Sequence, residues 1–126
     1  NENQVYASEY ESEFFSFTTA LQINKFYIND YKNEMQVFTG IIDDTKLLLT
    51  GEVTNPYYYN GNFDVMVKYY DENQAVIGEC HKKVKLYGDK LDKVGFNCET
   101  SEYSMYKKFE DIKYYKIFTE NINLSY

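Results

Sequence analysis

The chain has 126 residues and a formal net charge of −7, and all 13 of its basic residues are lysines. Nucleic-acid and anionic-membrane binding are therefore disfavoured, because both need clustered positive charge and base recognition commonly uses arginine. An aromatic share of 19% argues against disorder. No run of 18 apolar residues is present, so we expect no transmembrane segment in this chain.

The N-terminal stretch is polar and acidic, and we interpret residues 1–13 as a linker or flexible arm. Residues 14–126 are then expected to form a single domain, since domains of 100–150 residues are the commonest. At the start of that domain, a short helix over residues 8–21 competes with a strand over residues 17–28. Apolar and aromatic residues occur throughout this stretch, so both alternatives stay open.

Strand patterns become regular from residue 35 onward. Residues 35–42 are rich in β-forming types, and Asp43 and Asp44 indicate a turn after them. Residues 46–54 follow with apolar or small residues at every second position, which places one set on one face: Leu47, Leu49, Gly51 and Val53. Residues 63–70 alternate in the same way, as is typical of a strand with one buried face.

A turn over residues 71–74 leads into a long strand over residues 75–86. The period of two assigns one set of residues to its buried face: Val76, Gly78, Cys80, Val84 and Leu86. The other face then receives Ile77, Glu79, His81, Lys83 and Lys85. Beside His81, the residues Lys82, Lys83 and Lys85 form a small basic cluster. Gly88-Asp89 favours a hairpin into a strand with Val94, Phe96 and Cys98 on one face.

Residues 103–109 are a candidate helical turn, and residues 112–119 are the last predicted strand. Short strands separated by turns, without interleaved helices, predict an antiparallel all-β fold, either a sandwich or a barrel.

Cys80 and Cys98 lie at nearly equal distances from the predicted hairpin turn, so the hairpin would place them opposite each other on neighbouring strands. Directly opposite residues come within disulfide range, and we predict a Cys80–Cys98 disulfide. Two buried free thiols are the alternative. A disulfide implies an oxidising, extracellular compartment. Two cysteines and one histidine do not complete the usual zinc site, and we expect no metal and no cofactor.

A family resemblance covers about residues 46–98. Residues 49–55 read LTGEVTN, residues 63–71 read FDVMVKYYD, and residues 75–78 read AVIG. This order resembles the FxLYD domain and related immunoglobulin-like sandwich modules of bacterial surface lipoproteins. In the name motif, Val67 replaces Phe and Tyr69 replaces Leu, while the Tyr-Asp end matches. The resemblance implies an immunoglobulin-like β-sandwich on a bacterial cell surface, with no catalytic residues to transfer.

Within the matching segment, three residues have a structural interpretation. Gly51 permits close backbone approach or a bulge, Asn55 ends a strand and can cap the following loop, and Asp71 can accept backbone N–H groups of the next turn.

Tyr57, Tyr58 and Tyr59 form the candidate binding surface. Three consecutive residues cannot all face one core, so at least one ring should be exposed. Exposed tyrosine rings stack on sugars or contact partner proteins. The alternative is that these rings fold over the end of the sandwich.

Catalysis is disfavoured, because the chain has one histidine and none of the common hydrolase or nucleotide-binding motifs. The sequence therefore predicts a non-catalytic, exported cell-surface module that binds a protein or a cell-wall polymer. The alternatives are a structural spacer without its own ligand and, less favoured, a small hydrolase that uses carboxylates alone.

Overall fold

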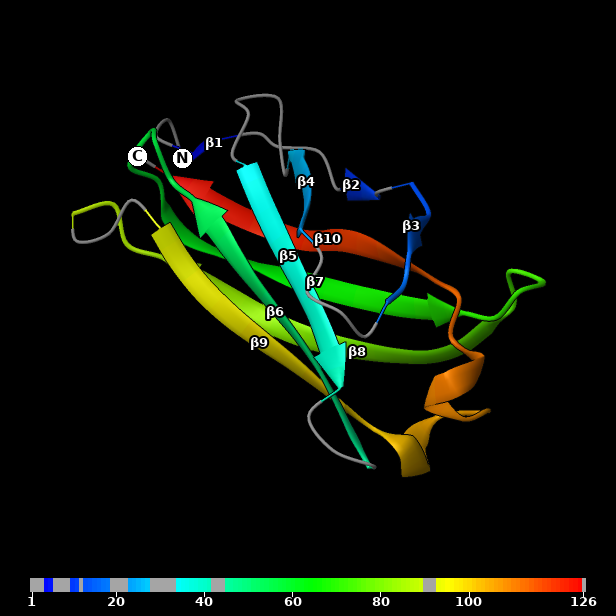
Figure 1. Cartoon of the computed structure of the whole chain (residues 1–126). Helices are drawn as coiled ribbons and strands as arrows, with labels where there is room; N and C mark the ends of the chain where they lie inside the picture. The colour runs from blue at the N-terminus through cyan, green and yellow to red at the C-terminus, as the bar shows by residue number, and fades with distance from the viewer. Residues whose placement is uncertain are drawn as a thin grey trace.

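Ten antiparallel strands form two sheets in the computed structural model, which describes residues 4–5, 10–11, 13–18, 23–27, 34–41, 45–89 and 93–125 (Figure 1). The first sheet has the order β1-β10-β7-β8, and β2 and β3 also pair with β10. Its strands are β1 (Gln4–Val5), β2 (Tyr10–Glu11), β3 (Phe15–Ser16), β7 (Asn60–Tyr70), β8 (Val76–Leu86) and β10 (Tyr114–Ser125). The second sheet has the order β4-β5-β6-β9, with β4 (Ile23–Tyr27), β5 (Glu34–Ile41), β6 (Lys46–Thr54) and β9 (Lys93–Ser101).

The predicted antiparallel all-β sandwich is confirmed. Two 3₁₀ helices, η1 (Glu102–Ser104) and η2 (Phe109–Asp111), connect β9 to β10 and account for the expected helical turn. Where a helix over residues 8–21 competed with a strand, the described residues form β2 and β3, and β4 lies within the predicted strand range. Among the described residues, no helix has the length and apolar character needed to cross a membrane.

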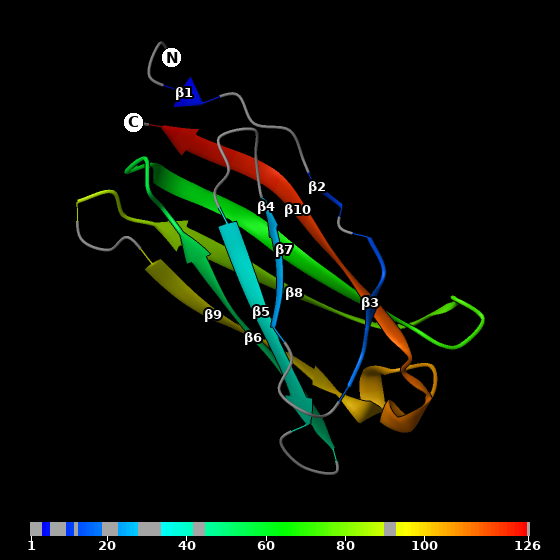
Figure 2. The same cartoon turned by 45° about the horizontal axis from the view of Figure 1, so that its top comes forward.

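The N-terminal residues contribute to the first sheet. Gln4 pairs with Ser125 in β1, and Tyr10 pairs with Thr119 in β2, so both short strands lie along β10 (Figure 2). The turn predicted at Asp43 and Asp44 lies outside the described residues.

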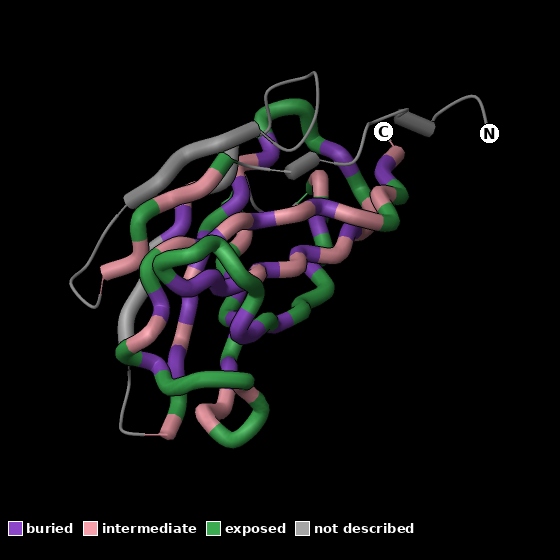
Figure 3. The backbone as a smooth tube through the Cα atoms, turned by 90° about the vertical axis from the view of Figure 1, so that its right-hand side faces the viewer, coloured by how far each residue is buried: buried purple, intermediate pink, exposed green. Residues whose placement is uncertain are grey.

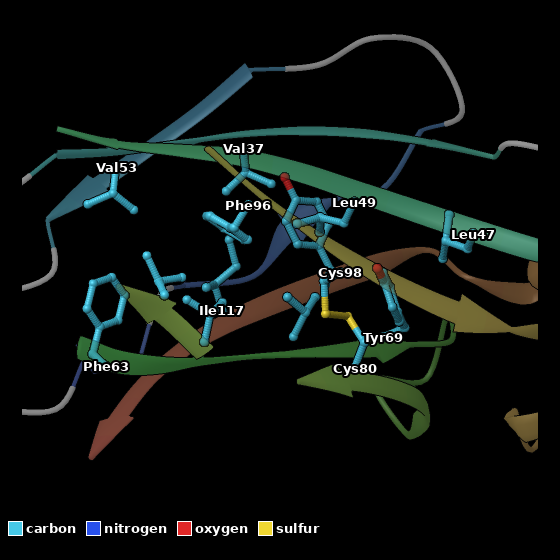
Figure 4. Packing of buried hydrophobic residues seen from close by; sticks show 14 of the residues in the cluster. Val37, Leu47, Leu49, Val53, Phe63, Tyr69, Cys80, Phe96, Cys98 and Ile117 are labelled. Carbon is cyan, nitrogen blue, oxygen red and sulfur yellow. A yellow bond between two sulfur atoms is a disulfide. The ribbon is translucent and has the colours of Figure 1, made fainter. Parts of the chain in front are cut away.

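The core lies between the two sheets, and it follows the alternation along the strands (Figure 3). The predicted inward set of β6 is buried. From β7, the fully buried side chains are Phe63, Val65, Val67 and Tyr69. Figure 4 shows these two layers of side chains meeting, with Phe96 of β9 and Ile117 of β10 among them. Each such side chain stabilises the fold by roughly 1.5–3 kcal/mol relative to its exposed state.

Gly51 has a specific packing role within this core. It pairs with Phe96 across β6 and β9, and a side chain at position 51 would collide with the Phe96 ring. The ring therefore occupies the space above the glycine, which is the close approach that the sequence suggested.

At the start of β8, the alternation of residues predicts the wrong inward-facing side chain. Ile77 is 2% exposed and Val76 is 42% exposed, the reverse of the prediction. The cause is an irregular register: Tyr69 pairs with Gly78, but Tyr70 pairs with Val76. Ile77 is the extra residue of a β-bulge, and one extra residue reverses which side of the strand faces the core.

The cysteine pairing is correct, but the expected geometry is wrong. Cys80 and Cys98 are disulfide-bonded, with their Cα atoms 6.0 Å apart. They are not partners in a hairpin, because β8 pairs with β7 while β9 pairs with β6 in the other sheet. The disulfide crosses the sandwich between the two layers (Figure 4). The connection from β8 to β9 folds one strand over the other. Inward residues at equal distances from that connection therefore meet, just as they would in a hairpin.

The two ends of the sandwich are different. Asn60 and Gln4 both pair with Ser125, so β1, the end of β10 and the start of β7 lie at the same end of the sandwich (Figure 1). We call this the proximal end, with residues 55–60 and 87–89. The opposite end, where residues 71–75 and 102–113 lie, is called the distal end. The 11 residues of β7 separate the two ends by roughly 35 Å.

Candidate functional site

A buried amide closes the β6–β7 loop at the proximal end. Asn55 follows β6 and is 0% exposed. Its side-chain Nδ2 donates a hydrogen bond to the Tyr59 carbonyl oxygen (2.9 Å), and its Oδ1 accepts one from the Tyr59 backbone N–H (3.0 Å). The Tyr58 N–H also donates to the Asn55 carbonyl oxygen at 3.3 Å. The loop capping expected of Asn55 is therefore present, and it satisfies two buried main-chain groups.

The three consecutive tyrosines divide between core and surface. Tyr59 is fully buried, whereas Tyr57 is 46% exposed and Tyr58 is 67% exposed. The ring centroids of Tyr57 and Tyr59 are 6.0 Å apart. Tyr58 has a φ of 58°, in the left-handed region. Tyr59 thus holds the loop on the core, and only Tyr57 and Tyr58 of the predicted set can offer a surface to a ligand.

A second loop lies against this one. The Gly88 N–H donates a hydrogen bond to Asn60 Oδ1 at 3.0 Å, and a side chain at position 88 would collide with the Tyr58 carbonyl oxygen. Tyr87, directly before that glycine, is 48% exposed. The proximity of Tyr87 to the tyrosine loop is not visible in the residue pattern, because the two loops meet only once the strands have paired.

At the distal end, Asp71 organises the β7–β8 turn. It is 4% exposed, and its Oδ1 accepts the backbone N–H groups of Asn73 (2.9 Å) and Ala75 (3.0 Å), as predicted. Its Oδ2 accepts a hydrogen bond from Lys107 Nζ at 2.8 Å. The Lys107 hydrogen bond, together with the backbone donors, lowers the pKa of Asp71. The same hydrogen bond raises the pKa of Lys107.

A polar hollow beside this ion pair is lined by Asp71, Glu72, Asn73, Lys107, Glu110, Asp111 and Lys113. Across the described part of the chain, no group of three or more His, Cys, Asp or Glu residues is arranged to hold a metal ion.

The single histidine lies on the outer face of β8. Its Nε2 is 3.5 Å from Glu79 Oε1, and both side chains are at least half exposed. A solvated pair of this kind lacks the enclosed setting in which a catalytic group is activated.

Comparison with family models and with curated proteins finds no match. Among solved structures, the chain is similar to the family 11 carbohydrate-binding module of the cellulosomal cellulase Lic26A-Cel5E of Clostridium thermocellum. The TM-score is 0.22 and the sequence identity is 11%, over 96% of this chain and 88% of that chain. A similarity this low assigns no role to any residue of this chain. The FxLYD resemblance stays a prediction.

Proposed function

We propose that this chain is a non-catalytic extracellular binding module whose ligand surface is formed by Tyr57 and Tyr58. The observation that carries the proposal is the exposure of two adjacent rings on a loop that Asn55 closes with two hydrogen bonds. A loop that is already ordered loses little conformational entropy on binding, and tyrosine rings offer a large apolar area with a polar tip.

The proposed location is the bacterial cell surface. A small β domain with a disulfide between its sheets fits an extracellular protein, because such bonds persist in oxidising compartments. The resemblance of residues 46–98 to lipoprotein modules supports a bacterial surface. The proposed partner is a protein or a cell-wall polymer at that surface.

The two alternatives differ in what they need from the structure. A hydrolase that uses carboxylates requires an acid whose pKa is raised. Asp71, the buried carboxylate beside the polar hollow, has a lowered pKa because it accepts three hydrogen bonds. A structural spacer has no need of exposed aromatic side chains on an ordered loop, and the binding test below separates it from a binding module.

The test compares binding of purified chains to isolated bacterial cell-wall fragments and to whole cells by co-sedimentation. The variant is Tyr57→Ser with Tyr58→Ser, and Tyr59 is kept because it is part of the core. We expect affinity to fall roughly tenfold or more, as the loss of two stacking rings would cause. The matched control, Lys82→Ser with Lys85→Ser, changes two exposed residues of the basic cluster on β8 and should bind normally.

Undiminished binding by the tyrosine variant would contradict the proposal and favour the spacer. Loss of binding only in the lysine variant would also contradict it, because contact would then depend on positive charge.

A further inference from the structure

The distal end also displays tyrosines. Tyr103 is 87% exposed and Tyr106 is 85% exposed, the highest values among the large hydrophobic side chains of the described residues. Both lie in the connection from β9 to β10 (Figure 1), Tyr103 within η1 and Tyr106 two residues after its end. The residue pattern of this segment predicts only a helical turn.

The backbone that carries these rings is held at closely spaced points. The Glu102 N–H donates to the Thr45 carbonyl oxygen at 2.8 Å, and the Tyr106 N–H donates to the Ile77 carbonyl oxygen at 2.9 Å. Ser101 caps η1 by accepting a hydrogen bond from the Tyr103 N–H at 3.3 Å.

Side chains of this segment also contact the sandwich. Met105 lies over Gly78, where a Cβ would be 3.1 Å from its Cγ. Lys107 forms its ion pair with Asp71, and Phe109 is buried in the core. The residues beside each exposed ring are therefore bound to the body of the sandwich, and both rings remain in solvent. The contacts that stabilise this segment are made by the neighbouring residues, so nothing in the fold requires the two rings to be exposed.

The charge around the rings argues against an anionic ligand. Residues 102–113 contain three acidic residues and three lysines, so the segment has no net charge although the chain carries −7. Lys107 is paired with Asp71, which lies outside this segment, and Asp71 and Glu72 line the same polar hollow as Lys107. That hollow is lined by four acidic residues and two lysines, so a polyanion would find no excess of positive charge here.

The size of the surface indicates a small, flat contact. Two tyrosine rings supply roughly 300–500 Å² at most, since an aromatic side chain buries about 150–250 Å². A specific protein interface needs about 800 Å² from each partner. Sugar rings carry apolar C–H faces that stack on aromatic rings, and a polysaccharide needs contacts to only a few of its sugar units.

We propose that Tyr103 and Tyr106 form a second binding site, a stacking surface for an uncharged polysaccharide. It lies on the distal end, roughly 35 Å from Tyr57 and Tyr58, and clear of the terminal strands at the proximal end. The two sites are structurally separate, because each loop is held by its own contacts.

Native gel electrophoresis of the full chain tests this site, with soluble β-glucan, xyloglucan or galactomannan cast into the gel. We expect at least one polymer to retard the native chain. Tyr103→Ser with Tyr106→Ser should weaken that binding roughly tenfold or more. Tyr103→Phe with Tyr106→Phe should retain it, because stacking needs the ring and not the hydroxyl group.

Asn97→Ala, at an exposed position on β9, is the matched control and should be retarded like the native chain. Tyr57→Ser with Tyr58→Ser is run beside it as the proximal variant. The proposal is overturned when none of the three neutral polymers retards the native chain, or when the distal serine variant is retarded normally. Loss of retardation only in the proximal variant would support the proposed function and overturn the distal site. Stronger retardation by polygalacturonate than by every neutral polymer would overturn the uncharged class of ligand.

Discussion

The two ends of the sandwich present exposed tyrosines in different ways. At the proximal end, one buried side chain, Asn55, holds the loop through both main-chain groups of Tyr59, four residues away. At the distal end, the segment with Tyr103 and Tyr106 is held by Ile77 and by Asp71, which is 36 residues from its partner Lys107. The first loop is closed by local contacts, and the second depends on how distant strands are placed. The distal end should therefore respond to changes in the sheets that leave the proximal end intact.

Removing the disulfide should have the largest effect on the difference between the two ends. Cys80→Ala with Cys98→Ala opens a link across 18 residues and should lower the free energy of unfolding by about 3 kcal/mol, measured by urea denaturation. The disulfide joins β8 to β9, and the distal segment follows β9 and bonds to Ile77 of β8. Hydrogen exchange at the Tyr106 N–H should therefore accelerate more than exchange at the Tyr59 N–H. Equal acceleration at both would show that the two ends respond as one unit.

Replacing Asn55 should instead weaken the proximal end and leave the distal end unchanged. Asn55→Ala leaves two buried main-chain groups of Tyr59 without their hydrogen bonds, and we expect a loss of about 2 kcal/mol. Exchange should accelerate at Tyr59 and stay unchanged at Tyr106. Asn97→Ala, at an exposed position on β9, is the control and should change stability by less than about 0.5 kcal/mol. A uniform change at both ends in the Asn55 variant would contradict a locally closed loop.

Acid should weaken the distal end through Asp71. Its pKa is lowered in the folded state, so its stabilising contribution is complete above the ordinary carboxyl pKa of about 4 and is lost as the pH falls through the lowered value. Native chain and Asp71→Asn should therefore differ in stability at neutral pH and converge below pH ~4, as measured by urea denaturation across the pH range. Lys107→Met should reduce the acid-dependent part, because the Lys107 hydrogen bond is its largest cause. A difference that persists undiminished in strong acid would rule out this ionisation.

The smallest effects on stability are expected from the exposed rings themselves. The two tyrosine pairs, Tyr57 with Tyr58 and Tyr103 with Tyr106, should each tolerate serine with a change below about 0.5 kcal/mol. Tyr59→Ser, in contrast, removes a fully buried ring and should cost about 3–5 kcal/mol. Thermal unfolding of the three variants measures this contrast. A large loss from either exposed pair would mean that those rings serve the fold and not a ligand.

Much of the fold could be predicted from the sequence wherever it depends on rules that act over a few neighbouring residues. Alternation along residues 46–54 and 63–70 correctly identified the buried faces, because side chains on a strand point to opposite sides in turn. Asn55 and Asp71 were also read correctly, since each bonds to backbone groups within four residues. At Ile77 the same rule failed, because a bulge is defined by the partner strand, which the alternation of one strand does not contain.

The two candidate sites differ in how far the sequence predicts them, for the same reason. The composition of residues 57–59 indicated exposed rings at the proximal end, but which ring is buried depends on how the Asn55 side chain meets the loop. The exposure of Tyr103 and Tyr106 was not predictable, because the contacts that hold their segment come from Thr45, Ile77 and Asp71.

The residue pattern was enough to predict the all-β class, the inward face of the regular strands, the two local loop caps and the identity of the cysteine partners. That Cys80 and Cys98 join different sheets, that Ile77 occupies a bulge, and that tyrosines are displayed at both ends became clear only from the folded chain. The difference lies in the range over which each interaction acts. Alternation and side-chain caps act over a few residues, whereas the sheet that a strand joins depends on pairing between segments far apart in the chain.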